Sequence, residues 1–138
     1  MIDDAAFYDC DLRYALVFPE SVREIGDYAF AYFRIGVKSL PESVVSIGEG
    51  AFAHCDLLGE ATIPDGVTSI GKACFEGCES LTSVTLPAGI STIEEGAFSG
   101  CRQLKAVRFK GTREQWDAIE IGGENEPLAG AEILFAES

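Results

Sequence analysis

The chain has 138 residues, the size of one domain with room for a substantial buried core. Hydrophobic residues make up 47% of it, too many for a disordered acidic tail, and no apolar run approaches the length of about 20 residues that a transmembrane helix needs. Ten basic and twenty-three acidic residues give a net charge of −13, which repels nucleic acid phosphates and anionic lipid. We therefore expect neither nucleic acid binding nor membrane insertion, and the charge favours basic or cation-bridged partners.

The chain starts with Met-Ile-Asp-Asp, which contains neither a basic region nor a leader-like apolar stretch. We therefore expect no secretion signal within the given chain. A mature or excised fragment of a secreted protein would look the same, so this expectation does not decide the cellular location.

One unit recurs along the chain: isoleucine, three residues that often begin with glycine, then alanine and phenylalanine, two residues and cysteine. The phenylalanines of this unit are separated by 23, 22, 23 and 23 residues. They are Phe7, Phe30, Phe52, Phe75 and Phe98. Neither a helix nor a strand period produces this spacing, whereas a stack of coils does. The constant spacing predicts that the five rings are buried in one stack.

Each coil is predicted to contain the same elements in the same order. Residues 81–86 alternate apolar with small polar side chains, as in a half-buried strand, and Pro87 ends the strand because it has no N–H to donate. A Val-x-x-Ile segment then forms a second short extended piece. Glycine makes a tight corner, and Ala-Phe-x-x-Cys makes a 3₁₀ or single helical turn. We predict a repeat solenoid of about five coils of 22–23 residues, mostly short parallel strands, in residues 1–110. Residues 111–138 are predicted to be a capping segment of the same domain.

The pattern I-G-x-x-A-F-x-x-C-x-x-L-x-x-V-x-L-P-x-x-V resembles the BspA-like leucine-rich repeats of bacterial surface proteins, over residues 2–109. The stretch Gly-Thr-Arg-Glu-Gln-Trp at residues 111–116 is similar to the segment that often closes such arrays. The resemblance implies a leucine-rich-repeat right-handed superhelix that is secreted or on a cell surface. It also implies adhesion or protein binding, and neither catalytic residues nor a cofactor.

Two departures from the pattern stand out. The second coil is one residue short and carries Phe33 where the others carry cysteine. Lys38 falls in an inward slot of this coil, so either Lys38 bends out to solvent or Val37 replaces it through a local shift of register. The first coil starts mid-unit at Ile2, which leaves three explanations open. The chain is cut from a longer array, a cap is lost, or another subunit covers that end by end-to-end self-association.

The five cysteines have three possible roles, as free thiols, as disulfides or as metal ligands. Four of them occupy one inward column, and Cys74 replaces an alanine of the neighbouring column. The column consists of Cys10, Cys55, Cys78 and Cys101. Free buried thiols are the favoured interpretation, because free cysteine behaves as a small buried hydrophobe. A disulfide is the second alternative. Zinc needs four ligands converging on one point, which a stacked column does not provide, so no metal is expected.

Three other features have a structural and a functional interpretation. His54 lies beside Cys55 on a turn and is predicted to point outward, so a catalytic Cys-His pair is not expected. The Glu94-Glu95 pair lacks the ligand spacing of a calcium loop and is predicted to be a solvated turn. Trp116 is predicted to cover the last coil, and the alternative is an exposed anchor for a partner.

The outward positions of the long strands are mostly small and uncharged, which suits close docking of a partner protein. Three adjacent regular coils make a continuous candidate face. Its residues are Glu60, Thr62, Ser83, Thr85 and Arg108. We predict a non-enzymatic module for protein–protein interaction or adhesion, whose partner is an unidentified protein such as a host or matrix protein. The alternative is a structural spacer within a longer repeat array.

Overall fold

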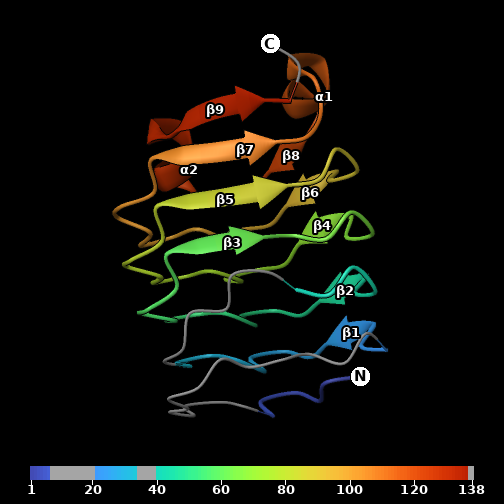
Figure 1. Cartoon of the computed structure of the whole chain (residues 1–138). Helices are drawn as coiled ribbons and strands as arrows, with labels where there is room; N and C mark the ends of the chain where they lie inside the picture. The colour runs from blue at the N-terminus through green and yellow to red at the C-terminus, as the bar shows by residue number, and fades with distance from the viewer. Residues whose placement is uncertain (7–20, 34–39, 137–138) are drawn as a thin grey trace.

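The computed structural model describes residues 1–6, 21–33 and 40–136, and the statements below concern these residues. The chain winds into a parallel β-solenoid whose coils stack from the N-terminal to the C-terminal end (Figure 1). The longer strands lie along one side of the stack and the two-residue strands along the other (Figure 1). The predicted repeat solenoid of about five coils is confirmed.

The longer strands form one four-stranded parallel sheet in the order β3-β5-β7-β9. Their bounds are β3 Glu60–Thr62, β5 Ser83–Leu86, β7 Ala106–Phe109 and β9 Glu132–Phe135. In this register Val84 lies between Ala61 and Val107, and all three are buried. Because strand side chains alternate between the two faces, the preceding and following residues point away from the core.

The Val-x-x-Ile segments form the second set of strands, as predicted. β1 (Glu24–Ile25) pairs with β2 (Ser46–Ile47), and β4 (Ser69–Ile70), β6 (Thr92–Ile93) and β8 (Glu120–Ile121) form a three-stranded parallel sheet. The isoleucines are aligned within each sheet, Ile25 with Ile47 and Ile93 with both Ile70 and Ile121, and Ile2 forms a bridge to Ile25. Ile70 and Ile93 are fully buried, whereas Ile121, on the last strand of this sheet, is 43% exposed.

The predicted phenylalanine stack is confirmed for four of its five members. The rings of Phe30, Phe52, Phe75 and Phe98 are buried, with successive centroids 5.4, 5.6 and 5.4 Å apart. Neighbouring rings are nearly parallel, at 4°, 9° and 13°. Phe7, like Cys10, Val37 and Lys38, lies outside the described residues.

The Ala-Phe-x-x-Cys segments are turns whose hydrogen bonds alternate between two kinds. Phe30 N donates to Ala51 O of the next coil at 2.8 Å, while Ala31 N donates within its own coil to Tyr28 O at 3.1 Å. Positive φ angles of 55° at Tyr28 and 60° at Tyr32 prevent these bonds from continuing as a helix. The predicted 3₁₀ or helical turn is therefore locally correct in its i→i+3 bonds, but the neighbouring coil provides every second acceptor.

The neighbouring coil requires glycine after the isoleucine at two positions, Gly26 and Gly48. A Cβ at Gly48 would lie 2.6 Å from Asp27 N, and Gly26 meets Asp4 N at the same distance. The carboxylate of Asp27 accepts a 2.8 Å hydrogen bond from Glu49 N, as that of Asp4 does from Asp27 N at 2.7 Å. The close approach of successive coils, rather than a sharp corner, therefore selects glycine here.

Residues 111–136 extend both sheets through a different sequence. Helix α1 (Arg113–Asp117) begins with a capping box between Thr112 and Gln115, and α2 (Glu126–Gly130) has proline in its first turn. The Trp116 ring packs edge-on against Phe109, with centroids 5.3 Å apart. Strands β8 and β9 then pair with β6 and β7 in parallel. In the described part of the chain, no helix is long and apolar enough to cross a membrane.

The last phenylalanine turn ends against a side chain. Phe98 N donates to Asn125 Oδ1 at 2.9 Å, in the place where Phe75 N donates to the backbone oxygen of Ala97. Asn125 Nδ2 donates in turn to Glu94 O and Gly122 O, both at 3.0 Å. Asn125 is the buried polar residue of the described core, and its amide substitutes for the backbone of a further coil.

Candidate binding surface

The five residues predicted to form a binding face do lie on one face of the long-strand sheet. The register places Glu60, Ser83 and Ala106 in one row. Thr62, Thr85 and Arg108 form the second row, and Glu60 and Arg108 are exposed while the others are partly exposed. The buried row of Ala61, Val84 and Val107 between them holds the face flat against the core. We call these two rows the strand face.

Strand β9 extends this face by residues that the sequence analysis missed. Glu132 aligns with Ala106, and Leu134 aligns with Arg108. Leu134 points outward while its neighbours Ile133 and Phe135 pack against the core, and Phe135 meets Phe109 edge-on at 6.4 Å. Residues 132–135 are Glu-Ile-Leu-Phe, which lacks the apolar–polar alternation of the other long strands, and no repeat column fixed a register against β7.

Charges on the strand face are not engaged in ion pairs with other described residues. The two pairs within the described part of the chain are Arg102–Glu79 at 4.0 Å and Lys110–Asp65 at 3.1 Å. Both are exposed, so each contributes little to stability. Glu60 and Glu132, on the outer strands β3 and β9, and Arg108, between Thr85 and Leu134, are therefore available to a partner on an otherwise uncharged surface.

The predicted free, buried thiols are confirmed for Cys55, Cys74, Cys78 and Cys101. Three of them donate to backbone oxygens of phenylalanines in the preceding coils: Cys55 to Phe30, Cys78 to Phe52 and Cys101 to Phe75, at 3.0–3.1 Å. Burial raises the pKa of the Cys55 and Cys101 thiols to about 12 and also raises the pKa of Cys74 and Cys78. A neutral thiol is a poor nucleophile, so these four thiols act as small buried side chains of the core.

His54 and Cys55 do not form a nucleophile–base pair. The thiol of Cys55 points into the core towards Phe30 O, whereas the half-buried His54 ring stacks on the exposed Tyr32 ring, with centroids 4.8 Å apart. The two side chains therefore point in different directions, Cys55 into the core and His54 towards the surface.

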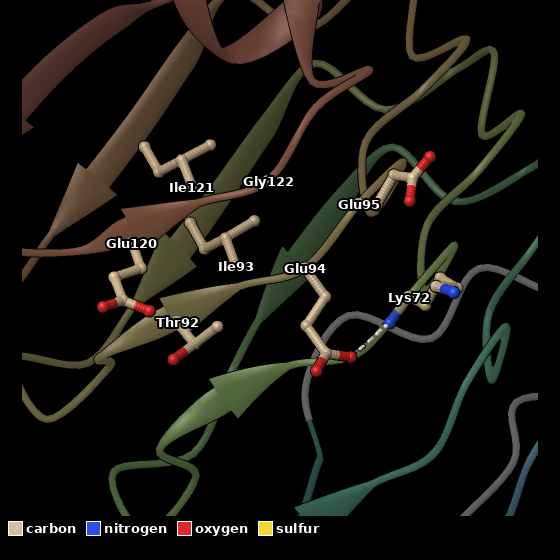
Figure 2. Close-up of a pocket in the computed structure, with 8 residues that line it drawn as sticks. All are labelled: Lys72, Thr92, Ile93, Glu94, Glu95, Glu120, Ile121 and Gly122. Carbon is tan, nitrogen blue, oxygen red and sulfur yellow. Dashed lines mark hydrogen bonds between the residues drawn. The ribbon is translucent and has the colours of Figure 1, made fainter.

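An open hollow of about 410 Å³ lies beside β6 and β8 (Figure 2). Its carboxylates do not converge: Glu94 accepts a hydrogen bond from Lys72 N at 3.0 Å, while Glu95 and Glu120 lie on opposite sides of it (Figure 2). Among the described residues, no group of three or more His, Cys, Asp or Glu side chains is placed to hold a metal ion. Glu94 and Glu95 are exposed, as a solvated turn requires.

Trp116 lines a smaller hollow of about 280 Å³ at the end of the stack. Ile121, Leu128 and Ile133 line it as well, so it is mostly apolar. Trp116 is partly buried against the core, which agrees with the prediction that it covers the last coil.

Comparison with known proteins identifies a family that has this repeat pattern. The model of the BspA-type leucine-rich repeat region matches residues 1–118 in six copies. No curated protein matches the chain.

Three solved structures share the fold. A leucine-rich cell surface protein from Faecalibacterium prausnitzii is 32% identical, with a TM-score of 0.68 over 77% of this chain and 34% of that chain. The leucine-rich repeat protein of T. pallidum is 25% identical, with a TM-score of 0.69 over 88% of this chain and 65% of that chain. A leucine-rich repeat protein from Bacteroides ovatus is 20% identical, with a TM-score of 0.65 over 97% of this chain and 46% of that chain. The chain thus spans a third to two thirds of the length of these proteins. Its stacked Phe and Cys columns and the family match together show that it belongs to the BspA-type leucine-rich repeat family.

Proposed function

We propose that the chain is a non-enzymatic protein-interaction module of a bacterial surface or secreted protein, and that the strand face binds the partner. The observation that carries the proposal is the pair of in-register rows on β3, β5 and β7. There, small uncharged side chains form most of the surface, with Glu60 on β3 and Arg108 on β7 as its charged residues. Flat surfaces of short side chains allow the close approach that shape complementarity requires.

Family membership supports an interaction role, and the cell surface protein of F. prausnitzii supports a surface location. Chemistry inside the solenoid is disfavoured because the described core is filled by apolar side chains and neutral buried thiols. More specifically, we propose that the module mediates adhesion to a host or matrix protein. The second candidate is a structural spacer, which the uniform stacking of the coils also favours.

The experiment adds bulk to the strand face without disturbing the core. In the double variant Thr62→Trp/Thr85→Trp, two large side chains stand next to each other on β3 and β5. Surface changes usually alter the free energy of unfolding by less than about 0.5 kcal/mol, so the variant should fold. Proteins captured by the unaltered chain from host-cell and matrix extracts are identified and purified, and their affinity for both forms is measured by calorimetry.

A matched control lies on the opposite sheet. Ser69 and Thr92 are in-register neighbours on β4 and β6, so Ser69→Trp/Thr92→Trp adds the same bulk at the same spacing elsewhere. We expect the strand-face variant to lose binding at least about ten-fold and the control to keep it, since steric blocking acts only within the contact area. Binding that survives Thr62→Trp/Thr85→Trp would place the partner elsewhere. If no extract protein binds the unaltered chain, the spacer function is the better account.

A further inference from the structure

Three exposed or half-exposed rings lie on two successive phenylalanine turns, Tyr28 and Tyr32 on one and His54 on the next, away from the strand face. Tyr28 is 41% exposed and Tyr32 is 44% exposed, and the Tyr32 ring lies nearly parallel to His54, at 14°. We call Tyr28, Tyr32 and His54 the aromatic strip. Folded chains usually bury aromatic side chains, and exposed rings on a rigid backbone often anchor partners.

The strip lies flat on the next coil because that coil carries glycine. A Cβ at Gly50 would overlap the Tyr28 ring, and a Cβ at Gly77 would overlap the His54 ring. Both glycines also have positive φ angles, +60° and +71°. The rings of Tyr28 and His54 therefore rest across neighbouring backbone, which fixes their orientation before any partner arrives.

Carboxylates lie near Tyr28, one member of the strip. Partial burial, followed by the charges of Glu49, Glu76 and Asp27, raises the pKa of the Tyr28 phenol. The backbone places Glu49 next to Tyr28, because Tyr28 N donates to Glu49 O at 2.8 Å. The backbone of Glu76 also lies next to that of His54, because His54 N donates to Glu76 O at 2.6 Å. Glu76 is exposed and Glu49 is partly exposed. Exposed rings next to carboxylates, on a chain of net charge −13, are complementary to a cation.

We propose that the aromatic strip binds an arginine side chain of a basic peptide segment, with its guanidinium over an exposed tyrosine ring and ion-paired to Glu49 and Glu76. Arginine fits better than lysine because its planar, weakly hydrated guanidinium stacks on rings and bridges carboxylates at the same time. The site lies on turns rather than on the long strands, so it goes beyond the function proposed for the strand face and does not depend on it.

The probe is a capped peptide of four arginines separated by glycines, and its affinity is measured by calorimetry at 0.15 M salt. We expect Tyr28→Leu/Tyr32→Leu to weaken binding about five-fold or more, because leucine has no ring for the cation. Tyr28→Phe/Tyr32→Phe keeps both rings and should bind within about two-fold of the unaltered chain. Thermal unfolding of each variant shows that it is folded. If the leucine variant binds within two-fold, or the phenylalanine variant is as weak as it, the proposal is overturned.

A charge-matched pair separates a local site from general attraction to an acidic protein. Glu49→Gln/Glu76→Gln and Glu42→Gln/Glu120→Gln change the net charge equally, and only the first pair adjoins the strip. The first should weaken binding about five-fold and the second less than two-fold. Equal losses would mean non-specific attraction and would overturn the site. So would equal affinity for the corresponding lysine peptide, or binding of a neutral tetrasaccharide at the strip in place of the peptide.

Discussion

The regular coils between residues 58 and 109 and the terminal segment of residues 111–136 satisfy the same backbone and core in different ways. In the coils, each residue meets its own counterpart: the Phe75 ring lies between Phe52 and Phe98, and Phe75 N donates to the backbone of the next coil. In the terminal segment, Asn125 provides the acceptor from a side chain. In the terminal segment a side chain thus takes the place that the backbone of a further coil has in the regular coils.

The two regions also differ in how completely they bury their apolar residues. Ile93 is fully buried between neighbours, whereas its counterpart Ile121 is 43% exposed and lines the terminal hollow with Trp116 and Leu128. Repeat arrays need a terminal unit that covers the last coil. We propose that residues 111–138 are this unit.

Removal of residues 111–138 should have the largest effect on the protein, because it takes away the whole terminal segment and leaves only the coils. The deletion uncovers Phe109 and the edge of β7, and leaves the Phe98 N–H without an acceptor. Exposed apolar surface and an unpaired strand edge promote association, so the shortened chain should aggregate. Light scattering and size-exclusion chromatography against the full chain measure this. A monomeric, equally stable shortened chain would show that the segment is not a cap.

Within the coils, loss of one stacked ring should have the largest effect of a single substitution. Phe75→Ala removes a fully buried ring that contacts rings on both sides and should lower the free energy of unfolding by about 3–5 kcal/mol. Phe75→Leu retains most of the volume and should cost clearly less. Urea unfolding compares the three proteins. A loss below about 1 kcal/mol for Phe75→Ala would contradict the stack.

The buried thiols predict a decrease in stability at alkaline pH. Burial raises the pKa of Cys55 and Cys101 to about 12, above the ordinary value of about 8.5 that the unfolded chain retains. Their contribution is therefore complete below about pH 8.5 and decreases as the pH rises towards 12, by up to about 1.4 kcal/mol per pH unit for each thiol.

The Cys74→Ala variant tests whether the buried thiols cause the decrease in stability at alkaline pH. The substitution restores the alanine found in the same column at Ala51 and Ala97, and it removes one of the buried thiols. Urea unfolding at pH 8 and pH 10 should show a smaller pH dependence in the variant, by up to about 1.4 kcal/mol per pH unit. An unchanged slope would show that Cys74 does not ionise on unfolding in this range. Titration of the unfolded, unreduced chain should report five thiols, and three or fewer would contradict the prediction that they are free.

Much of the coil architecture was predictable because the same environment recurs in every coil. The regular spacing of Phe30, Phe52, Phe75 and Phe98 shows which position in the coil each residue occupies. From this position one can predict which cysteines point inward and which strand residues point outward. The candidate strand face was predicted from these equivalent positions, since alternation on β3, β5 and β7 places Thr62, Thr85 and Arg108 together. That a partner binds there remains a proposal.

The rest depended on contacts that have no sequence period. The side-chain amide of Asn125 accepts the hydrogen bond that a backbone oxygen accepts in the other coils. A single asparagine in a loop of the sequence does not predict this contact. Gly50 and Gly77 are repeat positions, but only the structure shows that rings from the preceding coil lie across them. For the same reason the aromatic strip and the β9 extension of the strand face were missed.

Amide hydrogen exchange at Phe98 tests most directly that the terminal segment replaces the next coil. Asn125→Ala removes the acceptor and leaves a buried N–H unpaired, at a cost of about 1–3 kcal/mol. The Phe98 amide should then exchange faster, whereas the Phe75 amide, which donates to Ala97 O at 2.7 Å, should keep its protection relative to the stability of each protein. Asn125→Asp, which retains an acceptor, should affect Phe98 less. Equal protection of the Phe98 amide in the unaltered and Asn125→Ala proteins would contradict the account.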